Sequence, residues 1–239
     1  MIAFASLLDR LILTPARNGK VRLLIDYFRE SPDPDRGHAL AAITGDLEVA
    51  SVKPAMLRAL AGERIDETLF ALSYDYVGDL AETIALAWPA RRGANRAPSL
   101  SEIVEELQGA ARSEGPRLIE TWLDALDESG RWALLKLVTG GLRIGVSARL
   151  AKTALAEFGG KDVNDVEEIW HGLSPPYVSL FAWLEGAAEK PSPSAQAMFR
   201  PVMLAHPLEE ADLAAITPEA FIAEWKWDGI RVQAVNEGG

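Results

Sequence analysis

Residues 1–13 read MIAFASLLDRLIL, and their apolar side chains return every three or four positions. This spacing places them on one side of an α-helix. The stripe consists of Phe4, Leu7, Leu8, Leu11 and Ile12. A second stripe follows within residues 21–28, and the same period continues to about residue 186. The pattern predicts that most of the chain is a series of amphipathic helices.

Residues that begin and end helices stand between these stripes. Ser99 and Glu102 have the spacing of a capping box, in which each side chain accepts a hydrogen bond from the other residue's backbone N–H. Pro54 and Pro116 suit the first turn of a helix, and Gly62, Gly140 and Gly159 suit C-terminal caps. These boundaries predict ten to twelve short helices without a repeat of fixed length. We therefore expect a mainly α fold, an irregular multi-helix domain over residues 1–190.

The composition excludes several kinds of protein. Of 239 residues, 49% are hydrophobic and 25% charged, which is typical of a folded globular protein. There is no cysteine, so disulfides, thiolate catalysis and zinc sites with sulfur ligands are excluded. His38, His171 and His206 lack the spacing of helical metal ligands, and we predict no metal site among them. The N-terminus lacks the basic region of a signal peptide, and no uncharged run reaches the ~20 residues of a membrane span. We expect a cytoplasmic protein.

Charge is segregated along the chain. The net charge of −11 argues against nucleic-acid binding for the chain as a whole. Residues 10–22 nevertheless carry a charge of +4, and residues 131–161 carry +5. Acidic residues gather in 101–130, with a charge of −6, and in 162–189, which holds six acids and no Lys or Arg. The pattern suits either alternating solvated helix faces or one DNA-binding face, and the second requires the two basic segments to fold together.

The chain changes character after residue 190. Residues 190–195 read KPSPSA, which is typical of an extended linker, and we place the linker at residues 191–198. Within residues 222–235 the side chains alternate with period two, as in two strands, and Asp228-Gly229 supplies a bend between them. Because an isolated strand pair is marginal in water, we expect residues 199–239 to begin a second, β-containing domain that is incomplete.

Two stretches carry residues suited to chemistry. In EWKWDGIR, residues 224–231, two tryptophans flank Lys226, and burial among rings would lower the pKa of its ammonium and free a nucleophile. The alternative is a surface lysine stacked on tryptophan. In GGLRIG, residues 140–145, glycines would let the backbone approach a phosphate ribbon. Arg143, Arg149 and Lys152 would then contact phosphates, unless the stretch is a plain turn between helices with solvated arginines.

These stretches resemble motifs of ATP-dependent DNA ligases. Residues 226–231 are similar to the Lys-x-Asp-Gly-x-Arg motif of that family and of related nucleotidyltransferases. Gly140–Gly145 resembles the Gly-x-Leu-Arg-x-Gly stretch of the ligases' helical DNA-binding domain. Further similar stretches, in the same order, are Thr14-x-x-Arg17-x-x-Lys20, Val77-Gly78-Asp79-Leu80 and residues 199–205.

The resemblance implies roles for individual residues. Lys226 would attack the α-phosphate of ATP to give lysyl-AMP, Glu224 would read the adenine, and Arg231 would lie near the ribose and phosphate. Mg²⁺ would stabilise the charge of phosphoryl transfer, although no metal ligand can be assigned in this chain. The DNA-binding residues would be Thr14, Arg17, Lys20, Gly78, Gly140, Gly141, Arg143, Gly145, Arg149 and Lys152.

The resemblance also implies partners and a reaction. The intact enzyme would seal nicked double-stranded DNA as a monomer, using ATP and Mg²⁺. The 239-residue chain alone would bind DNA without joining strands and would retain neither cofactor. One alternative is a non-catalytic helical DNA-binding clamp or scaffold. Another is an RNA ligase or capping-type nucleotidyltransferase, which the long helical region with GGLRIG disfavours.

Overall fold

A computed structural model describes residues 1–49, 52–89, 96–111 and 113–192, with short pieces at 209–214, 216–217, 219–220, 225 and 232. Regular structure within these residues is helical, so the mainly α prediction is confirmed for them. The segment expected to hold two strands lies outside the described residues, apart from Trp225 and Val232. The start of a second domain therefore stays a prediction.

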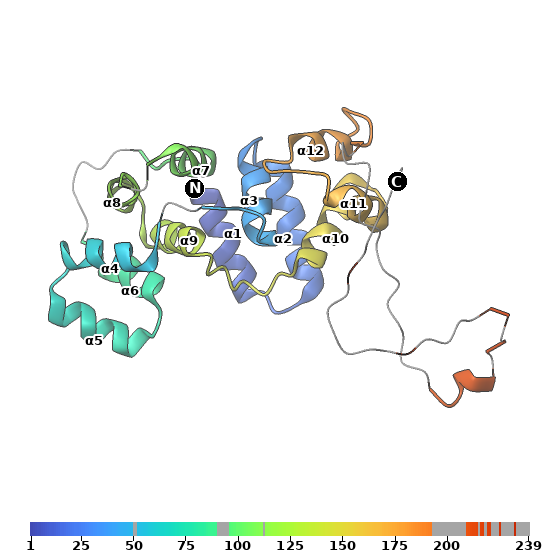
Figure 1. The fold of residues 1–239 in the computed structure, drawn as a ribbon, viewed down its shortest axis with the longest axis horizontal. Helices are drawn as coiled ribbons and strands as arrows, with labels where there is room; N and C mark the ends of the chain where they lie inside the picture. Colours follow the sequence, from blue (N-terminus) through green and yellow to red (C-terminus); the bar gives the residue numbers. More distant parts are fainter. Residues whose placement is uncertain are drawn as a thin grey trace.

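Twelve α-helices and one short 3-10 helix make up the regular structure of the described residues (Figure 1). In chain order they are α1 (Ile2–Leu13), α2 (Arg17–Glu30), α3 (Asp35–Thr44), α4 (Pro54–Gly62), α5 (Glu67–Val77), α6 (Leu80–Ala87), α7 (Leu100–Gly109), α8 (Gly115–Ala125), α9 (Glu128–Thr139), α10 (Ala148–Gly159), α11 (Val163–Trp170), α12 (Val178–Leu184) and η1 (Asp212–Ala214). In Figure 1, α1 to α3 lie in the centre, with α4 to α6 and α8 on one side and α10 to α12 on the other.

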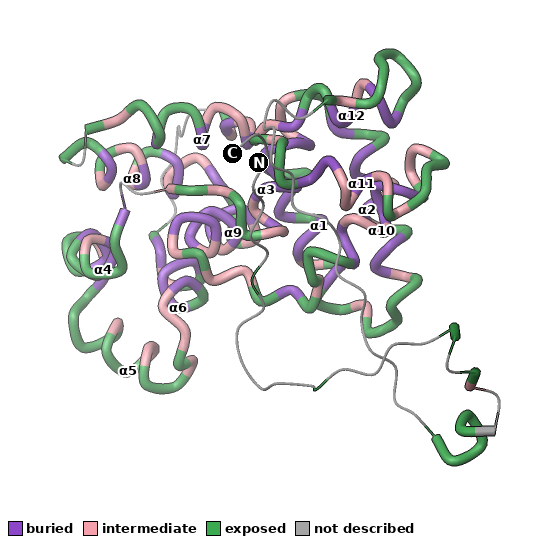
Figure 2. Tube along the Cα trace, turned by 45° about the vertical axis from the view of Figure 1, so that its right-hand side comes forward, coloured by how far each residue is buried: buried purple, intermediate pink, exposed green. Residues whose placement is uncertain are grey.

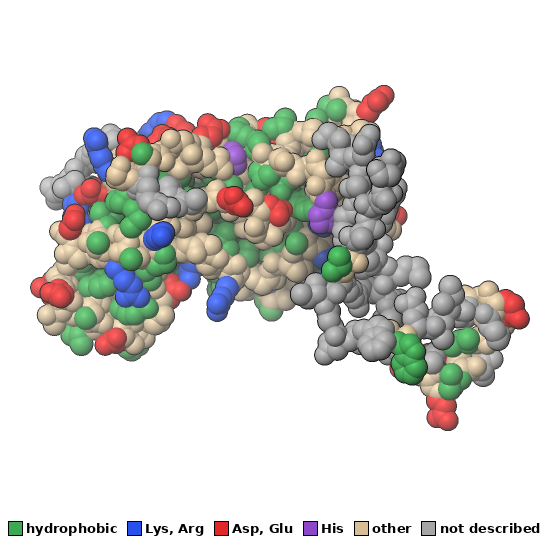
Figure 3. Space-filling model, in the orientation of Figure 1, with side chains coloured by type: hydrophobic (Ala, Val, Ile, Leu, Met, Phe, Trp, Pro, Cys, Tyr) green, Lys and Arg blue, Asp and Glu red, His purple; other side chains and the backbone are tan. Residues whose placement is uncertain are grey.

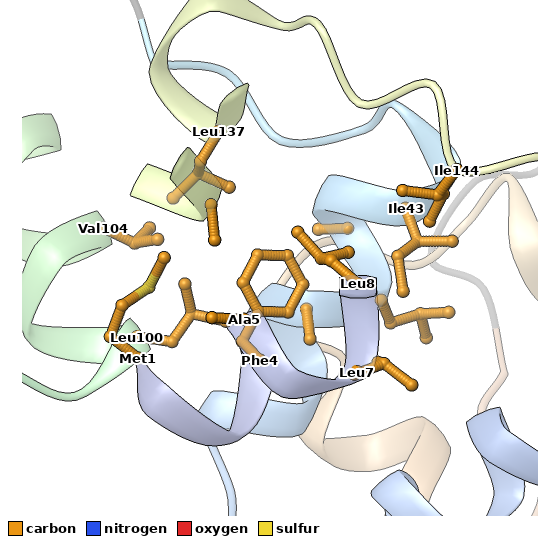
Figure 4. Close-up of a cluster of buried hydrophobic side chains, with 14 of the residues drawn as sticks. Met1, Phe4, Ala5, Leu7, Leu8, Ile43, Leu100, Val104, Leu137 and Ile144 are labelled. Carbon is orange, nitrogen blue, oxygen red and sulfur yellow. The ribbon is translucent and has the colours of Figure 1, made fainter. Parts of the chain in front are cut away.

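The core is built around α1. Its predicted stripe is buried along most of its length, since Phe4, Leu7, Leu8 and Leu11 are at most 3% exposed. Figure 4 shows Phe4, Leu7 and Leu8 among residues from α3, α7 and α9, including Leu137. Ile12 was expected in the stripe but is 48% exposed; it stands one residue before the end of α1.

Most predicted helix boundaries are confirmed. Ser99 and Glu102 form both hydrogen bonds of a capping box at the start of α7. Gly140 ends α9 in the left-handed conformation, with φ of +67°. Gly62 and Gly159 were predicted as caps but are the last residues of α4 and α10, and the caps follow one residue later. A shift of one residue is common at helix ends, which fray.

Packing differs between the two sides of the molecule. Helix α5 contains no buried residue, and Figure 2 shows it as exposed or half-buried along its length. On the other side, α3 meets the chain around α12 closely. There the guanidinium of Arg36 bonds Asp33 at 2.7 Å and Glu185 at 2.5 Å, and lies 4.3 Å from the ring centre of Phe181. The charged residue is thus enclosed by partners.

Candidate nucleic-acid interface

Three stretches that the sequence singled out lie on the lower side of the molecule in Figure 1. They are the junction of α1 and α2 (residues 14–20), the turn between α5 and α6 (residues 77–80), and the loop between α9 and α10 (residues 140–147), here called the glycine loop. Helix α10 packs against α2, and α6 packs against α9. The two basic segments, 10–22 and 131–161, therefore fold together, as a DNA-binding face requires.

The glycine loop is fixed at its start and near its middle. After Gly140 reverses the chain, the amide of Gly141 donates to the carbonyl of Lys136 at 3.1 Å. Ile144 is 3% exposed and lies beside Ile43 of α3 in the core (Figure 4). A side chain added at Gly140 would meet nothing within 4 Å, so the backbone there is open to an approaching ligand.

Lys20 connects α2 to the glycine loop. Its ammonium Nζ donates to the carbonyl of Ile144 at 2.8 Å and to that of Gly145 at 3.0 Å. Lys20 is only 8% exposed, and a Cβ built on Gly145 would lie 2.5 Å from Nζ. The residue predicted to contact phosphate thus lies beneath the loop, with two of its three donors used by backbone carbonyls.

Arginines beside this connection remain available. Arg17 begins α2, Arg143 precedes the buried Ile144, and Arg149 lies in the first turn of α10. All three are exposed, and none forms a side-chain hydrogen bond or ion pair with a described residue. We call Arg17, Arg143 and Arg149 the basic edge. Exposed guanidinium groups without partners are suited to binding phosphate oxygens in two-point contacts.

The other four cations of segment 131–161 are engaged within the fold. Arg131 is buried and donates to the carbonyls of Leu123 and Trp88. Lys136 pairs with Asp79, and the ammonium groups of Lys152 and Lys161 lie over tryptophan rings. The charge of +5 counted from the sequence therefore overstates the charge that this segment offers to a ligand.

The α5–α6 turn is tied to the end of α9. Gly78 is exposed and ends α5 with φ of +73°, a conformation that favours glycine. Asp79 begins α6 by accepting from the amide of Glu82 at 3.0 Å, and it accepts from Nζ of Lys136 at 2.5 Å. Burial opposes ionisation of Asp79, but the bonds from Lys136 and Glu82 outweigh it and lower the pKa of its carboxyl. This pair holds residues 77–80 beside the start of the glycine loop.

The side chains of Lys152 and Thr14, both predicted to contact DNA, interact with other residues of the fold. Nζ of Lys152 lies 4.8 Å from the ring centre of Trp170 in α11. Burial lowers the pKa of this ammonium, although nearby Glu167 and Asp46 oppose the shift. The hydroxyl of Thr14 is half-buried and donates to the carbonyl of Arg10 at 2.7 Å. Contact with DNA stays a prediction for both residues.

The described residues of acidic segment 101–130 lie on the side opposite the glycine loop (Figure 1). Figure 1 shows α7, α8 and α12 along the upper side, and Figure 3 shows several Asp and Glu side chains over α7 at that edge. Segment 101–130, with its charge of −6, spans α7 and α8. This segment is therefore separated from the basic edge, whereas the second acidic segment, 162–189, includes α11, which packs against α10 and brings Glu167 near the ammonium of Lys152.

Comparison with known proteins identifies the family of the chain. The family model described as DNA ligase N terminus matches residues 1–156. The chain belongs to this family. The matched part of this ligase N-terminal chain contains the basic edge, Lys20, the α5–α6 turn and the glycine loop.

Two curated relatives extend the comparison over nearly the whole chain. The chain is 25% identical over 248 residues to the "Probable DNA ligase" of Koribacter versatilis (strain Ellin345). It is 27% identical over 250 residues to "DNA ligase 1" of Korarchaeum cryptofilum (strain OPF8). Each alignment covers 98% of this chain but only 42% and 45% of the relatives. The ligase N-terminal chain thus spans less than half the length of these two proteins.

The nucleotidyltransferase motif lies outside the described residues. Glu224, Lys226 and Arg231 are therefore known here by sequence only. Among the residues that are described, no cluster of three or more His, Asp or Glu could hold a metal ion. None of the described helices has the length and apolar character needed to cross a membrane.

Sequence reasoning missed two features of the ligase N-terminal fold. One is a cavity of about 320 Å³ between the end of α3 and the glycine loop, lined in part by Thr44, Gly45, Leu142 and Val146. The other is the burial of Ile144, which anchors the loop. A single isoleucine between Arg143 and Gly145 was the available signal, because a buried side chain in a polar loop is a common anchor.

Proposed function

We propose that this chain is the N-terminal DNA-binding part of an ATP-dependent DNA ligase that seals nicks in double-stranded DNA during replication, repair or recombination. Residues 1–190 form the DNA-binding domain, residues 191–198 a linker, and residues 199–239 the beginning of the nucleotidyltransferase domain. The protein acts as a monomer in the cytoplasm. The 239-residue chain alone binds DNA but does not join strands.

The observation that carries this proposal is the joining of the two basic segments through Lys20 and the glycine loop. The exposed arginines of the basic edge, which have no described partner, thus lie in the same region as Gly140, where an added side chain would meet nothing within 4 Å. Arginine and backbone N–H contacts to phosphate fix a protein on the duplex without reading its sequence. A ligase needs that property, because nicks occur in any sequence.

The chemical step is assigned to the motif at residues 224–231. Lys226 is the residue that would be adenylated by ATP with Mg²⁺, while Glu224 and Arg231 would contact the nucleotide. The support for these roles is the motif together with the ligase relatives, whose alignments extend over 98% of the chain. Neither ATP nor Mg²⁺ is expected to be retained by the 239-residue chain.

DNA binding is tested by fluorescence anisotropy with a labelled nicked duplex over a range of salt concentrations. Arg143→Ala should weaken binding about tenfold on duplexes of different sequence and reduce the slope of log K against log salt by about 0.9. Arg29→Ala is the matched control, because Arg29 is exposed near the end of α2, far along the helix from the glycine loop. Binding that does not respond to salt would contradict phosphate contact.

Adenylation is tested separately by mass spectrometry after incubation with ATP and Mg²⁺. The intact ligase should carry AMP on Lys226 and lose it in Lys226→Arg, since a guanidinium stays protonated and is no nucleophile. The 239-residue chain should carry no adduct. An intact protein that binds nicked DNA but never takes up AMP would favour the scaffold alternative instead.

A further inference from the structure

We infer that Lys20 is a positioning residue, which orients the glycine loop for DNA, and not a phosphate contact itself. This inference rests on the proposed DNA-binding function and concerns how the interface is built. It follows from the direction of three groups: the Lys20 ammonium, the carbonyls that it holds, and the amides behind those carbonyls.

The two carbonyls held by Lys20 fix the direction of two amide groups. The peptides that follow Ile144 and Gly145 are trans, and in a trans peptide the N–H points opposite to the C=O. Because both carbonyls point inward to Nζ, the N–H groups of Gly145 and Val146 point away from Lys20. No described residue accepts a hydrogen bond from either amide. The loop therefore presents two free donors on the side away from α2.

Burial supports an internal role for the ammonium. Lys20 is 8% exposed, whereas Arg17, one turn earlier on α2, is exposed. No described carboxylate lies within ion-pair distance of Lys20, so its partners are the two carbonyls. A buried ammonium without a counter-ion is costly unless its hydrogen bonds are satisfied, so this arrangement ties the loop firmly to the helix.

Gly145 is fitted to the same arrangement. Its φ of +64° turns the carbonyl inward, and the missing Cβ leaves the space that the ammonium occupies. From the other side, Ile144 holds the loop to the core. Arg143 directly precedes this anchored pair, so its backbone and the two free amides belong to one anchored segment, from which the exposed guanidinium extends. Such donors can bind the same phosphate group or neighbouring ones.

A double-mutant cycle distinguishes positioning from direct contact. We measure the affinity of the 239-residue chain for nicked duplex with Lys20→Met, Arg143→Ala and the double variant. If Lys20 acts through the loop, each single change should weaken binding about tenfold. The affinity of the double variant should then lie within about twofold of that of the single variant that binds more weakly. If Lys20 and Arg143 contact phosphate independently, their losses of affinity multiply, and the double variant should bind about 100-fold more weakly than the wild type. That result would overturn the inference.

Arg22→Met is the matched control on the same helix. Arg22 is exposed, has no described partner, and loses the same charge in this variant. Arg22→Met should reduce the affinity for nicked duplex less than threefold. In the double variant with Arg143→Ala, the two losses of affinity should multiply. If Arg22→Met reproduces the coupling seen with Lys20→Met, the effect is a general one of charge, and the inference is wrong.

A second variant keeps the inference testable if Lys20→Met does not fold, which thermal unfolding followed by circular dichroism would reveal. Gly145→Ala retains every charge and displaces the Lys20 ammonium, a movable end of a flexible side chain. It should show the same coupling to Arg143→Ala. In the wild type, NMR signals of the Gly145 and Val146 amides should shift when DNA is added, and unchanged signals would overturn the inference. A wild type that does not bind nicked DNA would instead refute the proposed function.

Discussion

Arg36 on α3 and Arg143 on the glycine loop have opposite surroundings. The guanidinium of Arg36 is bonded to two carboxylates and covered by the ring of Phe181. Arg143 is exposed and meets no described partner. The neighbouring glycines differ in the same way: a Cβ on Gly37 would lie 1.6 Å from the carbonyl oxygen of Pro176, whereas one on Gly140 would meet nothing.

Residue type alone does not distinguish structural from functional residues in this chain. Arginine and glycine build the junction of α3 with the chain around α12, here called the α3 junction, and they also build the glycine loop. In the junction the guanidinium of Arg36 has several partners, so substitution should affect folding. In the glycine loop, Arg143 and the amides of Gly145 and Val146 have no described partner, so replacing Arg143 should affect binding and leave folding almost unchanged.

Gly37→Ala should have the largest effect on stability. The added methyl group would overlap the backbone of residue 176, and backbone cannot move as a flexible side chain does. We expect a loss of about 3 kcal/mol or more in the free energy of unfolding, measured by urea titration. Gly62→Ala is the control, because it ends α4 with open space around it and should be neutral or slightly stabilising. Equal effects would contradict the packing described for α3.

Arg36→Met should lower the free energy of unfolding by less than Gly37→Ala does, by about 2 kcal/mol at neutral pH. The loss is smaller because Asp33 and Glu185 are partly solvated once unpaired. The hydrogen bond from Arg36 lowers the pKa of the Glu185 carboxyl below its ordinary value. A depressed folded-state pKa stabilises the protein above the unfolded pKa, and this contribution is lost as pH falls through the folded pKa. The difference in the free energy of unfolding between wild type and Arg36→Met should therefore become smaller below about pH 4. A difference that stays constant with pH would show that the ion pairs contribute nothing.

The division between the α3 junction and the glycine loop was only partly predictable from the sequence. Helical spacing, the Ser99 capping box and the left-handed Gly140 depend on neighbours along the chain, and such local patterns predicted them. Other partners are distant in sequence: Glu185 lies 149 residues from Arg36, Gly145 lies 125 from Lys20, and Asp79 lies 57 from Lys136. No local pattern encodes these pairs. Counting cations by segment consequently predicted where the basic edge lies but not which cations remain free.

Asp79→Ala tests a residue that is paired within the fold, as Arg36 is, but lies near the glycine loop. Asp79 caps α6 and pairs with Lys136 beside that loop. Loss of the cap and the pair should cost about 1–2 kcal/mol. Asp79→Asn keeps a good cap and loses only the charge, so it should cost about half as much. Thermal unfolding of both variants measures this. Because the folded-state pKa of Asp79 is lowered, the cost of Asp79→Asn should also diminish as the pH falls below about 4.

Arg117→Ala should have the smallest effect, and it tests whether exposure alone makes an arginine functional. Arg117 is exposed and has no described side-chain partner, as is true of Arg143, but it lies on α8 within the acidic segment. Nearby carboxylates would repel a DNA backbone, so Arg117 should contact no phosphate. We expect less than a twofold change in affinity for nicked duplex, an unchanged salt slope, and a change in stability within about 0.5 kcal/mol. The measurement is made beside Arg143→Ala on the same duplex. If both variants weaken binding equally, DNA meets the acidic side as well, and the separation between the basic edge and α8 does not define the binding face.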